Sequence, residues 1–273
     1  MINTVRVRGI DLAYEDVGPT DDDAPDGAPL VWGHGLSRSV AEDDQFPMID
    51  WQRIHRTRRV VRFDARGHGE SGPLASPVDG AWDQLALDEL GLIDALGIDQ
   101  VVLGGASMGT ATALHATLIL GDRVRGLVLT IPPTAWDTRR EQAQLYEAMA
   151  QMVDDGGVEP LIEASAAVPP PDPFAEIDDF NELRAASLRR AEPQRLAAVF
   201  RGAAHADLPD PDAVATITAP TLILAWSGDP GHPVSTAERL ADLLPNAELS
   251  VASTLGELFA WTDLVADFPS QLA

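Results

Sequence analysis

The sequence predicts an α/β fold, with a mostly parallel twisted sheet, helices on both faces and an inserted helical cap. Two observations lead to this prediction. Short apolar, β-branched runs alternate with stretches of helical periodicity along most of the chain, and strands that are apolar throughout are typical of parallel sheets covered on both sides. The alternation is interrupted once, between Pro132 and Pro220, where no convincing strand occurs.

The individual elements follow from the same patterns. The runs "TVRVRG" and "IDLAYED" predict an opening β-hairpin. Apolar runs predict the later strands, at residues 30–35, 59–65, 100–106, 126–132, 220–226 and 247–253. Apolar residues at helical spacing predict the helices, at residues 82–97, 108–120 and 257–268.

The interrupted segment is predicted to be the cap. It contains "EQAQLYEAMAQMV", in which Leu145, Met149, Met152 and Val153 fall on one helical face. We interpret this face mainly as packing, with some members lining a pocket. The predicted α/β core therefore comprises residues 1–133 and 217–273, and the predicted cap comprises residues 134–216.

Composition excludes several classes of function. The formal charge of −24 disfavours binding to nucleic acid and to anionic membranes. The absence of cysteine excludes disulfides and thiolate metal sites, and the absence of lysine excludes a Schiff-base lysine. No signal-peptide core and no membrane-length apolar run are visible, so we expect a cytoplasmic protein.

The most informative short stretch is Gly105-Ala-Ser107-Met-Gly109, because it lies between a predicted strand and a predicted helix. A G-x-S-x-G pattern at such a junction is typical of a nucleophilic serine on a tight turn. The helix that follows directs backbone N–H groups toward the serine. A serine hydroxyl needs a base and oxyanion donors before it can react.

Several further motifs occur in a consistent order. "GHGLS" (33–37) follows an early strand, "FDARGHGES" (63–71) follows the next, and "GDPGHP" (228–233) follows "PTLILAW". With the serine turn and the position of the cap, these motifs resemble the α/β-hydrolase superfamily over nearly the whole chain. The resemblance implies oxyanion donation by the backbone N–H groups of Leu36 and Met108, and it implies that Asp229 is the catalytic acid.

The chain departs from the family pattern at the base. The family's histidine usually follows the last strand, where this chain has Gly256-Glu257, and no histidine follows His232. We consider His232 as the base because it lies three residues after Asp229. Glu257 is a possible substitute base, and a serine without a proper base is the third possibility. The other five histidines are expected to be structural or exposed.

Three functions remain open at this stage. The leading hypothesis is a serine hydrolase that cleaves a small, apolar ester, thioester or lactone through an acyl-enzyme on Ser107. The alternatives are a non-hydrolytic enzyme of the same superfamily, such as a lyase or cyclase, and a ligand-binding pseudoenzyme. Both alternatives follow from the missing family histidine, since fold alone does not decide function.

We expect a small-molecule substrate and no cofactor. The stretch from Gly67 to Gly72 spells G-x-G-x-x-G, but a loop sequence follows it rather than the helix that a dinucleotide site needs. No H-E-x-x-H pattern occurs, so we expect no metal either. The sequence gives no indication of the oligomeric state.

Overall fold

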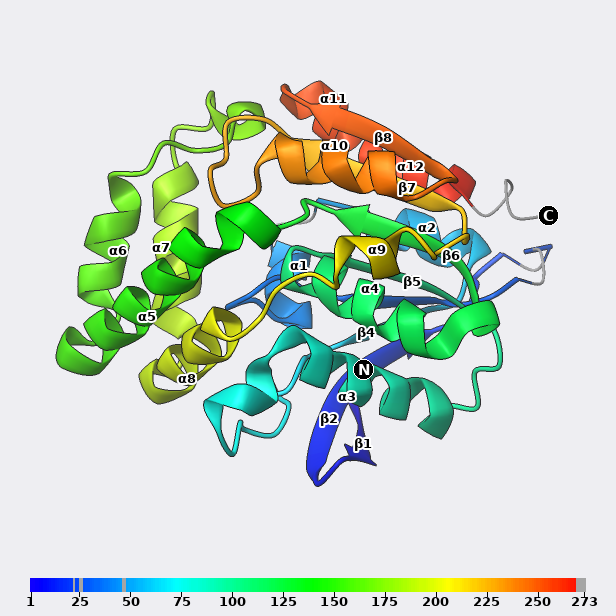
Figure 1. Cartoon of the computed structure of the whole chain (residues 1–273), viewed down its shortest axis with the longest axis horizontal. Coiled ribbons are helices and arrows are strands. Elements are labelled where there is room, and N and C mark those ends of the chain that lie inside the picture. Colours follow the sequence, from blue (N-terminus) through cyan, green and yellow to red (C-terminus); the bar gives the residue numbers. More distant parts are fainter. Residues whose placement is uncertain (22, 25–26, 46–47, 269–273) are drawn as a thin grey trace.

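The structure is a computed structural model that describes residues 1–21, 23–24, 27–45 and 48–268. An eight-stranded sheet runs through its centre in the order β1-β2-β4-β3-β5-β6-β7-β8 (Figure 1). The strands are β1 Asn3–Val7, β2 Ile10–Val17, β3 Leu30–Gly33, β4 Val60–Phe63, β5 Val101–Ala106, β6 Val124–Thr130, β7 Thr221–Trp226 and β8 Ala247–Ala252.

The sheet is mostly parallel, which confirms the predicted fold class. β1 pairs antiparallel with β2, and β2 pairs antiparallel with β4, whereas β4, β3, β5, β6, β7 and β8 pair in parallel. The helices are α1 Val40–Gln45, α2 Trp51–Thr57, α3 Trp82–Ala95, α4 Met108–Leu120, α5 Arg139–Gly156, α6 Glu159–Ala166, α7 Phe180–Arg190, α8 Pro193–Ala204, α9 Pro211–Val214, α10 Val234–Leu243, α11 Leu255–Phe259 and α12 Trp261–Asp267.

Two apolar cores cover the two faces of the sheet, because successive side chains of a strand point to opposite faces. Leu103 of β5 belongs to one core, with residues of α3, α4 and α10. Its neighbour Val102 belongs to the other, with residues of α2 and α12. Strands that are buried on both faces explain the continuous apolar runs of the sequence.

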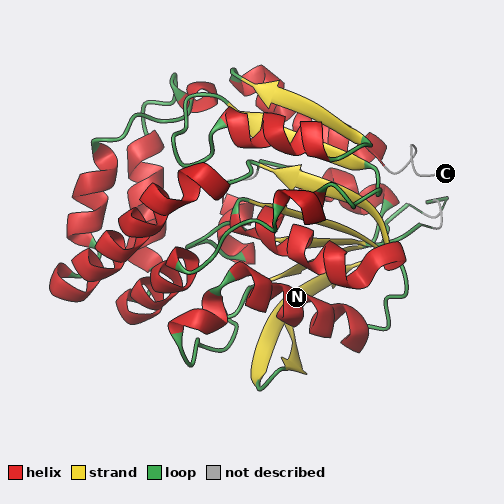
Figure 2. Cartoon of the chain, viewed as in Figure 1, coloured by secondary structure: helices red, strands yellow, loops and turns green. Residues whose placement is uncertain are grey.

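Helices α5 to α8 follow β6 and precede β7. They lie together beyond the end of the sheet toward which the arrowheads of β6 and β8 point (Figures 1 and 2). They share a small apolar core, which includes Val153, Leu196 and Phe200. Leu145 does not join this core, since it is 51% exposed. The division at residues 134 and 216 stays a prediction.

The end of the described chain differs from the expectation in one detail. The helix predicted over residues 257–268 is two helices, α11 and α12, joined at Ala260. A capping box of Thr254 and Glu257 starts α11 earlier than the apolar pattern indicated. Within the described residues, none of the helices combines the length and the apolar character that a membrane crossing requires.

One acidic side chain of α3 is buried with a carboxyl oxygen that lacks a hydrogen-bond partner within the described chain. Glu89 is 1% exposed, and its Oε2 atom has no hydrogen-bond partner among the described residues. Burial raises the pKa of its carboxyl group to about 8, because the charged form loses its hydration. Between pH 4.5 and about 8 the folded state therefore holds a proton that the unfolded state has released.

We predict that Glu89→Gln stabilises the protein increasingly as the pH rises. Stability of the wild type should fall from pH 4.5 to about 8, whereas the neutral amide of the variant has no proton to hold. At pH 7 the difference in the free energy of unfolding should be about 3 kcal/mol, and near pH 4.5 it should vanish. Thermal denaturation across this pH range measures it, with the exposed Glu163→Gln as control. An equal difference at all pH values would contradict the assignment.

Candidate active site

The serine turn forms at the junction of β5 and α4. Ser107 adopts φ 53° and ψ −105°, a backbone conformation that non-glycine residues rarely adopt. Its N–H donates to the Thr130 carbonyl at 2.9 Å, and the Thr110 hydroxyl shares its single proton between the carbonyls of Gly105 and Thr130, each at 2.9 Å. These bonds hold the strained turn to the neighbouring strand β6 and point the serine hydroxyl out of the sheet.

The two glycines of the motif are required by close backbone packing. A Cβ atom on Gly105 would lie 2.4 Å from the Gly109 carbonyl carbon, and a Cβ atom on Gly109 would lie 2.0 Å from the Gly33 carbonyl oxygen. Both distances are far shorter than any van der Waals contact. The first turn of α4 is therefore pressed directly against the backbones of β5 and β3.

The segment after β3 lies beside Ser107. A Cβ atom on Gly35 would lie 3.8 Å from the Ser107 Cβ atom, and Leu36 lines the same cavity as Ser107. His34 braces this segment, since its Nδ1–H donates to the Gly35 carbonyl at 2.7 Å and its Nε2 accepts from the Ala65 N–H at 3.0 Å. Both ring nitrogens are occupied, so His34 has none left for Ser107.

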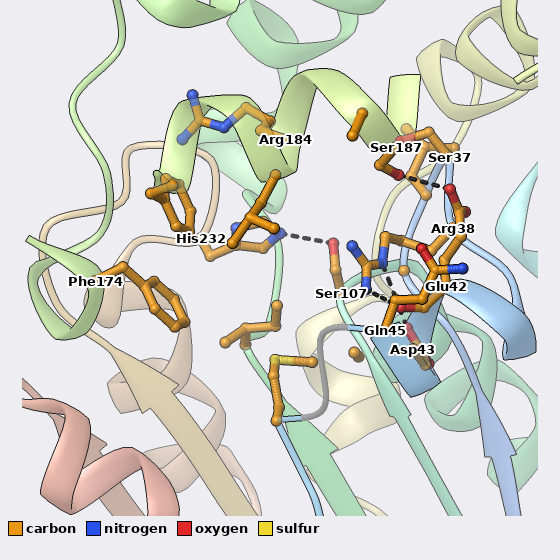
Figure 3. Close-up of a pocket in the computed structure, with 18 of the residues that line it drawn as sticks. Ser37, Arg38, Glu42, Asp43, Gln45, Ser107, Phe174, Arg184, Ser187 and His232 are labelled. Carbon is orange, nitrogen blue, oxygen red and sulfur yellow. Dashed lines mark hydrogen bonds and ion pairs between the residues drawn. The ribbon is translucent and has the colours of Figure 1, made fainter. Parts of the chain in front are cut away.

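A chain of hydrogen bonds connects Ser107, His232 and Asp229. The Nε2 atom of His232 lies 2.8 Å from the Ser107 Oγ atom, and its Nδ1 atom lies 2.8 Å from Asp229 Oδ2 (Figure 3). A carboxylate only accepts hydrogen bonds, so Nδ1 carries the proton and Nε2 presents its lone pair to the serine hydroxyl. This is the tautomer that can accept the serine proton.

The loop after β7 is folded back over the end of β6, which brings His232 to Ser107. The Thr134 N–H, just after β6, donates to the Gly231 carbonyl at 3.1 Å. The Gly231 N–H donates to Asp229 Oδ1 at 2.8 Å, which closes a tight turn between the acid and the histidine. On the other side, the Asp172 N–H donates to the Ser227 carbonyl at 2.9 Å.

The carboxylate of Asp229 is held in its charged form. Burial alone raises the pKa of this group, but the hydrogen bond and charge of His232, together with the N–H groups of Gly231 and Trp226, outweigh it. The net effect holds the pKa of Asp229 well below its usual range. The sequence indicated Trp226 only as an apolar pocket residue, and its contact with the acid was missed: its indole N–H donates to Asp229 Oδ2 at 3.0 Å. Its position three residues before the acid was the available signal.

The structure does not bring Glu257 to Ser107. Glu257 is exposed in the first turn of α11, where its carboxylate accepts the N–H groups of Ser253 and Thr254. These backbone hydrogen bonds lower the pKa of Glu257. Glu257 is not one of the described residues that line the cavity at Ser107.

The remaining histidines lie elsewhere. His68 is buried, and burial with the nearby His34 and Arg195 lowers its pKa to about 3, which makes it a neutral structural residue. The Nε2 atom of His115 lies 3.0 Å from the Asp207 carbonyl, and His205 is exposed. His55 is half-buried rather than exposed as expected.

A cavity of about 360 Å³ opens at Ser107 and His232. Its lining combines residues of the sheet ends, α1, α5 and α7, so the helices between β6 and β7 form much of its wall. Trp226 and Phe174 contribute aromatic surface, and their rings meet edge to face. Met149 of the predicted helical face also lines the cavity.

Comparison with known proteins places this arrangement in a family. Residues 27–263 match the model of the alpha/beta hydrolase family. The chain belongs to this family. It is accordingly an alpha/beta-hydrolase enzyme.

Relatives and solved structures agree with the family. The chain is 28% identical over 215 residues to 3-oxoadipate enol-lactonase 1 of Acinetobacter baylyi, covering 78% of this chain and 76% of the relative. It is 29% identical over 230 residues to 2-hydroxymuconate semialdehyde hydrolase of Pseudomonas putida, covering 78% and 74%. The fold matches a thermophilic esterase from Thermogutta terrifontis with a TM-score of 0.79 at 23% identity, covering 100% and 99% of the two chains.

Proposed function

We propose that this alpha/beta hydrolase is a serine hydrolase that cleaves small esters, thioesters or lactones through an acyl-enzyme on Ser107. The observation that carries the proposal is the 2.8 Å contact between Ser107 Oγ and His232 Nε2. It supplies the base that the segment after the last strand lacks. The alternatives, a non-hydrolytic enzyme and a pseudoenzyme, both depended on a missing base, and no observation favours them.

The proposed reaction begins at the serine hydroxyl. Ser107 Oγ attacks the substrate carbonyl carbon while His232 Nε2 takes the hydroxyl proton. Asp229 holds the ring in place and stabilises the imidazolium that forms. The proton then passes to the leaving oxygen or sulfur. A water molecule, deprotonated by the same histidine, attacks the acyl carbon and regenerates the serine.

The charge that develops on the carbonyl oxygen needs donors. We assign this role to the backbone N–H groups of Leu36 and Met108. Met108 directly follows the serine at the start of α4, and Leu36 belongs to the segment that lies beside it. Such donors are worth about 3 kcal/mol each in the transition state.

The cavity supports a small substrate with an apolar part. Its volume of about 360 Å³ is at the lower end of the range for small-molecule sites, which is roughly 300–1,000 Å³. Phe174, Phe180 and Trp226 supply apolar surface close to His232. The enol-lactonase names among the relatives add support for a lactone or ester.

Covalent labelling tests the proposal directly. Incubation with a fluorophosphonate should add one label to the intact protein, which mass spectrometry detects, and proteolysis should place the label on Ser107. Ser107→Ala should remain unlabelled under the same conditions. An unlabelled wild type that also fails to hydrolyse activated esters would contradict a serine hydrolase.

We further predict that Trp226 positions the acid. Trp226→Phe keeps the ring but removes the N–H that shares Asp229 Oδ2 with His232. The kcat for an activated ester should fall about tenfold, which corresponds to roughly 1.4 kcal/mol for a hydrogen bond to a charged group. The acid limb of the kcat/KM profile should also move to higher pH, because Asp229 then binds the protonated ring more strongly.

The matched control is Trp261→Phe. Trp261 is buried and stacks on Trp226, with ring centroids 6.2 Å apart, but its indole nitrogen has no partner among the described residues. Trp261→Phe also removes an indole N–H and a similar amount of packing surface, but it removes no hydrogen bond of Asp229. Its pH profile should match the wild type. A shift of equal size in both variants would mean that packing, rather than the hydrogen bond, is responsible.

A further inference from the structure

The cavity at Ser107 has two unlike sides. His232, Phe174 and Arg184 lie on one side of the serine, and a polar group lies on the other (Figure 3). Phe180 stacks on Phe174, and the Trp226 ring lies edge to face against Phe174 and His232. The polar group consists of Ser37, Arg38, Glu42, Asp43, Gln45, Ser187 and Arg190. The base delivers its proton to the leaving group, so the leaving group lies on the His232 side. The acyl half of a substrate therefore extends toward the polar side.

Arg38 lies next to the nucleophile on this polar side. A Cβ atom on Gly35 would lie 3.7 Å from Arg38 Cγ and 3.8 Å from Ser107 Cβ, so both side chains flank the same point. Arg38 Nη2 donates to the Glu42 carbonyl at 2.8 Å, and its Nε donates to Asp43 at 3.4 Å. Its Nη1 has no hydrogen-bond partner among the described residues.

Arg190 of α7 faces the same space with its donors unused. Its nearest acidic atom is Glu42 Oε1, at 3.8 Å, which is too long for a hydrogen bond. Glu42 is instead engaged by the Ser187 hydroxyl at 2.6 Å. Within the described chain the Arg190 guanidinium therefore makes no hydrogen bond, although it lines the cavity.

The polar side of the cavity is less acidic than the chain as a whole. The chain has 19 basic and 43 acidic residues, whereas this side has Arg38 and Arg190 against Glu42 and Asp43. Asp43 is engaged by Arg38, and Glu42 is engaged by Ser187. Guanidinium groups that keep free hydrogen-bond donors beside the nucleophile favour an anionic ligand group.

The polar side also has room beyond the serine. A second cavity of about 290 Å³ shares Ser37, Arg38, Glu42, Gln45 and Arg190 with the first and adds the charged residues Glu192 and Arg195. The two cavities meet at Arg38 and Arg190. A substrate chain that passes Ser107 on this side reaches guanidinium N–H groups that make no hydrogen bond within the described chain. These groups match the planar geometry of a carboxylate.

We infer that Arg38 and Arg190 bind a carboxylate on the acyl half of the substrate, so that the preferred substrates are monoesters or lactones of dicarboxylic acids. The inference rests on the proposed serine-hydrolase function, because it assigns the two halves of the substrate from the position of His232. It adds a specificity that the hydrolytic chemistry alone does not require.

Two esters of equal acyl length test the inference. The mono-p-nitrophenyl ester of glutaric acid carries a carboxylate, and p-nitrophenyl pentanoate does not. The wild type should favour the glutarate ester by at least tenfold in kcat/KM. Arg38→Met should lower this preference about tenfold, and Arg190→Gln should lower it severalfold, whereas Arg189→Gln should leave it unchanged. Arg189 is an exposed neighbour on α7 that pairs with Glu159 and Glu182.

Each result is decisive. A wild type that prefers the neutral ester, or a preference that survives in both Arg38→Met and Arg190→Gln, would overturn the carboxylate site while leaving the serine hydrolase intact. Failure to turn over either ester, together with no fluorophosphonate label on Ser107, would overturn the proposed function and the inference with it. Thermal denaturation identifies any variant that has lost its fold, and Arg190 lies on a half-exposed position where substitution is well tolerated.

Discussion

Replacement of His232 by alanine should lower kcat/KM for an activated ester by about 10³-fold or more, with little change in thermal stability. The loss follows from the geometry, because His232 Nε2 is 2.8 Å from the serine oxygen. Without it, Ser107 must release its proton to water. The fluorophosphonate labelling rate should fall in parallel, since labelling requires the same activated hydroxyl.

Two further variants make this result specific. His205→Ala removes the exposed histidine that caps the C-terminal end of α8, and it should retain wild-type activity. Glu257→Gln should also remain within about twofold of the wild type, because Glu257 caps α11. Retained activity in His232→Ala combined with a large loss in Glu257→Gln would assign the base to Glu257 instead.

Gly109→Ala should be among the most destabilising single substitutions in the chain. The new methyl group would lie 2.0 Å from the Gly33 carbonyl oxygen, which is a rigid backbone atom of β3. Overpacking usually costs about 1–3 kcal/mol, and a clash with three backbone atoms of Gly33 belongs at or above that limit. Denaturant unfolding should show a loss of about 3 kcal/mol or more, with activity lost as the turn at Ser107 shifts.

The matched control is Gly256→Ala. Gly256 also occupies the second position of a helix, but a Cβ atom there would meet no heavy atom within 4 Å. The free energy of unfolding of the Gly256→Ala variant should differ from that of the wild type by less than about 0.5 kcal/mol, or be slightly higher. If Gly109→Ala unfolds at the same denaturant concentration as the wild type, α4 and β3 can separate without a loss of stability. The account of the serine turn would then be wrong.

Much of the fold was predictable because its signals are local. The parallel strands are buried on both faces, so they appear in the sequence as uninterrupted apolar runs. The turn at Ser107 was also predictable, since the glycines at 105 and 109 reflect a backbone contact that permits no side chain. The split between α11 and α12 was missed because apolar spacing continues across Ala260.

The contact between His232 and Ser107 was not decidable from sequence. His232 follows β7, and Ser107 follows β5, so the end of β6 lies between them. Whether the imidazole crosses this gap depends on the bond from Thr134 to Gly231, which no local pattern reveals. The carboxylate-binding side was hidden for a related reason. Arg38 and Arg190 are far apart in the chain, and only the packing of α7 above α1 brings them to one cavity.

The compact acid–histidine turn has a consequence for how this enzyme can change. Asp229 and His232 lie on one loop, and no residue of β8 or of the described segment after it lines the cavity at Ser107. In the proposed mechanism, proton transfer depends on two short loops rather than three. The surface of the region from β8 to α12 should therefore accept substitutions, insertions or engineered attachments while the proposed reaction is preserved.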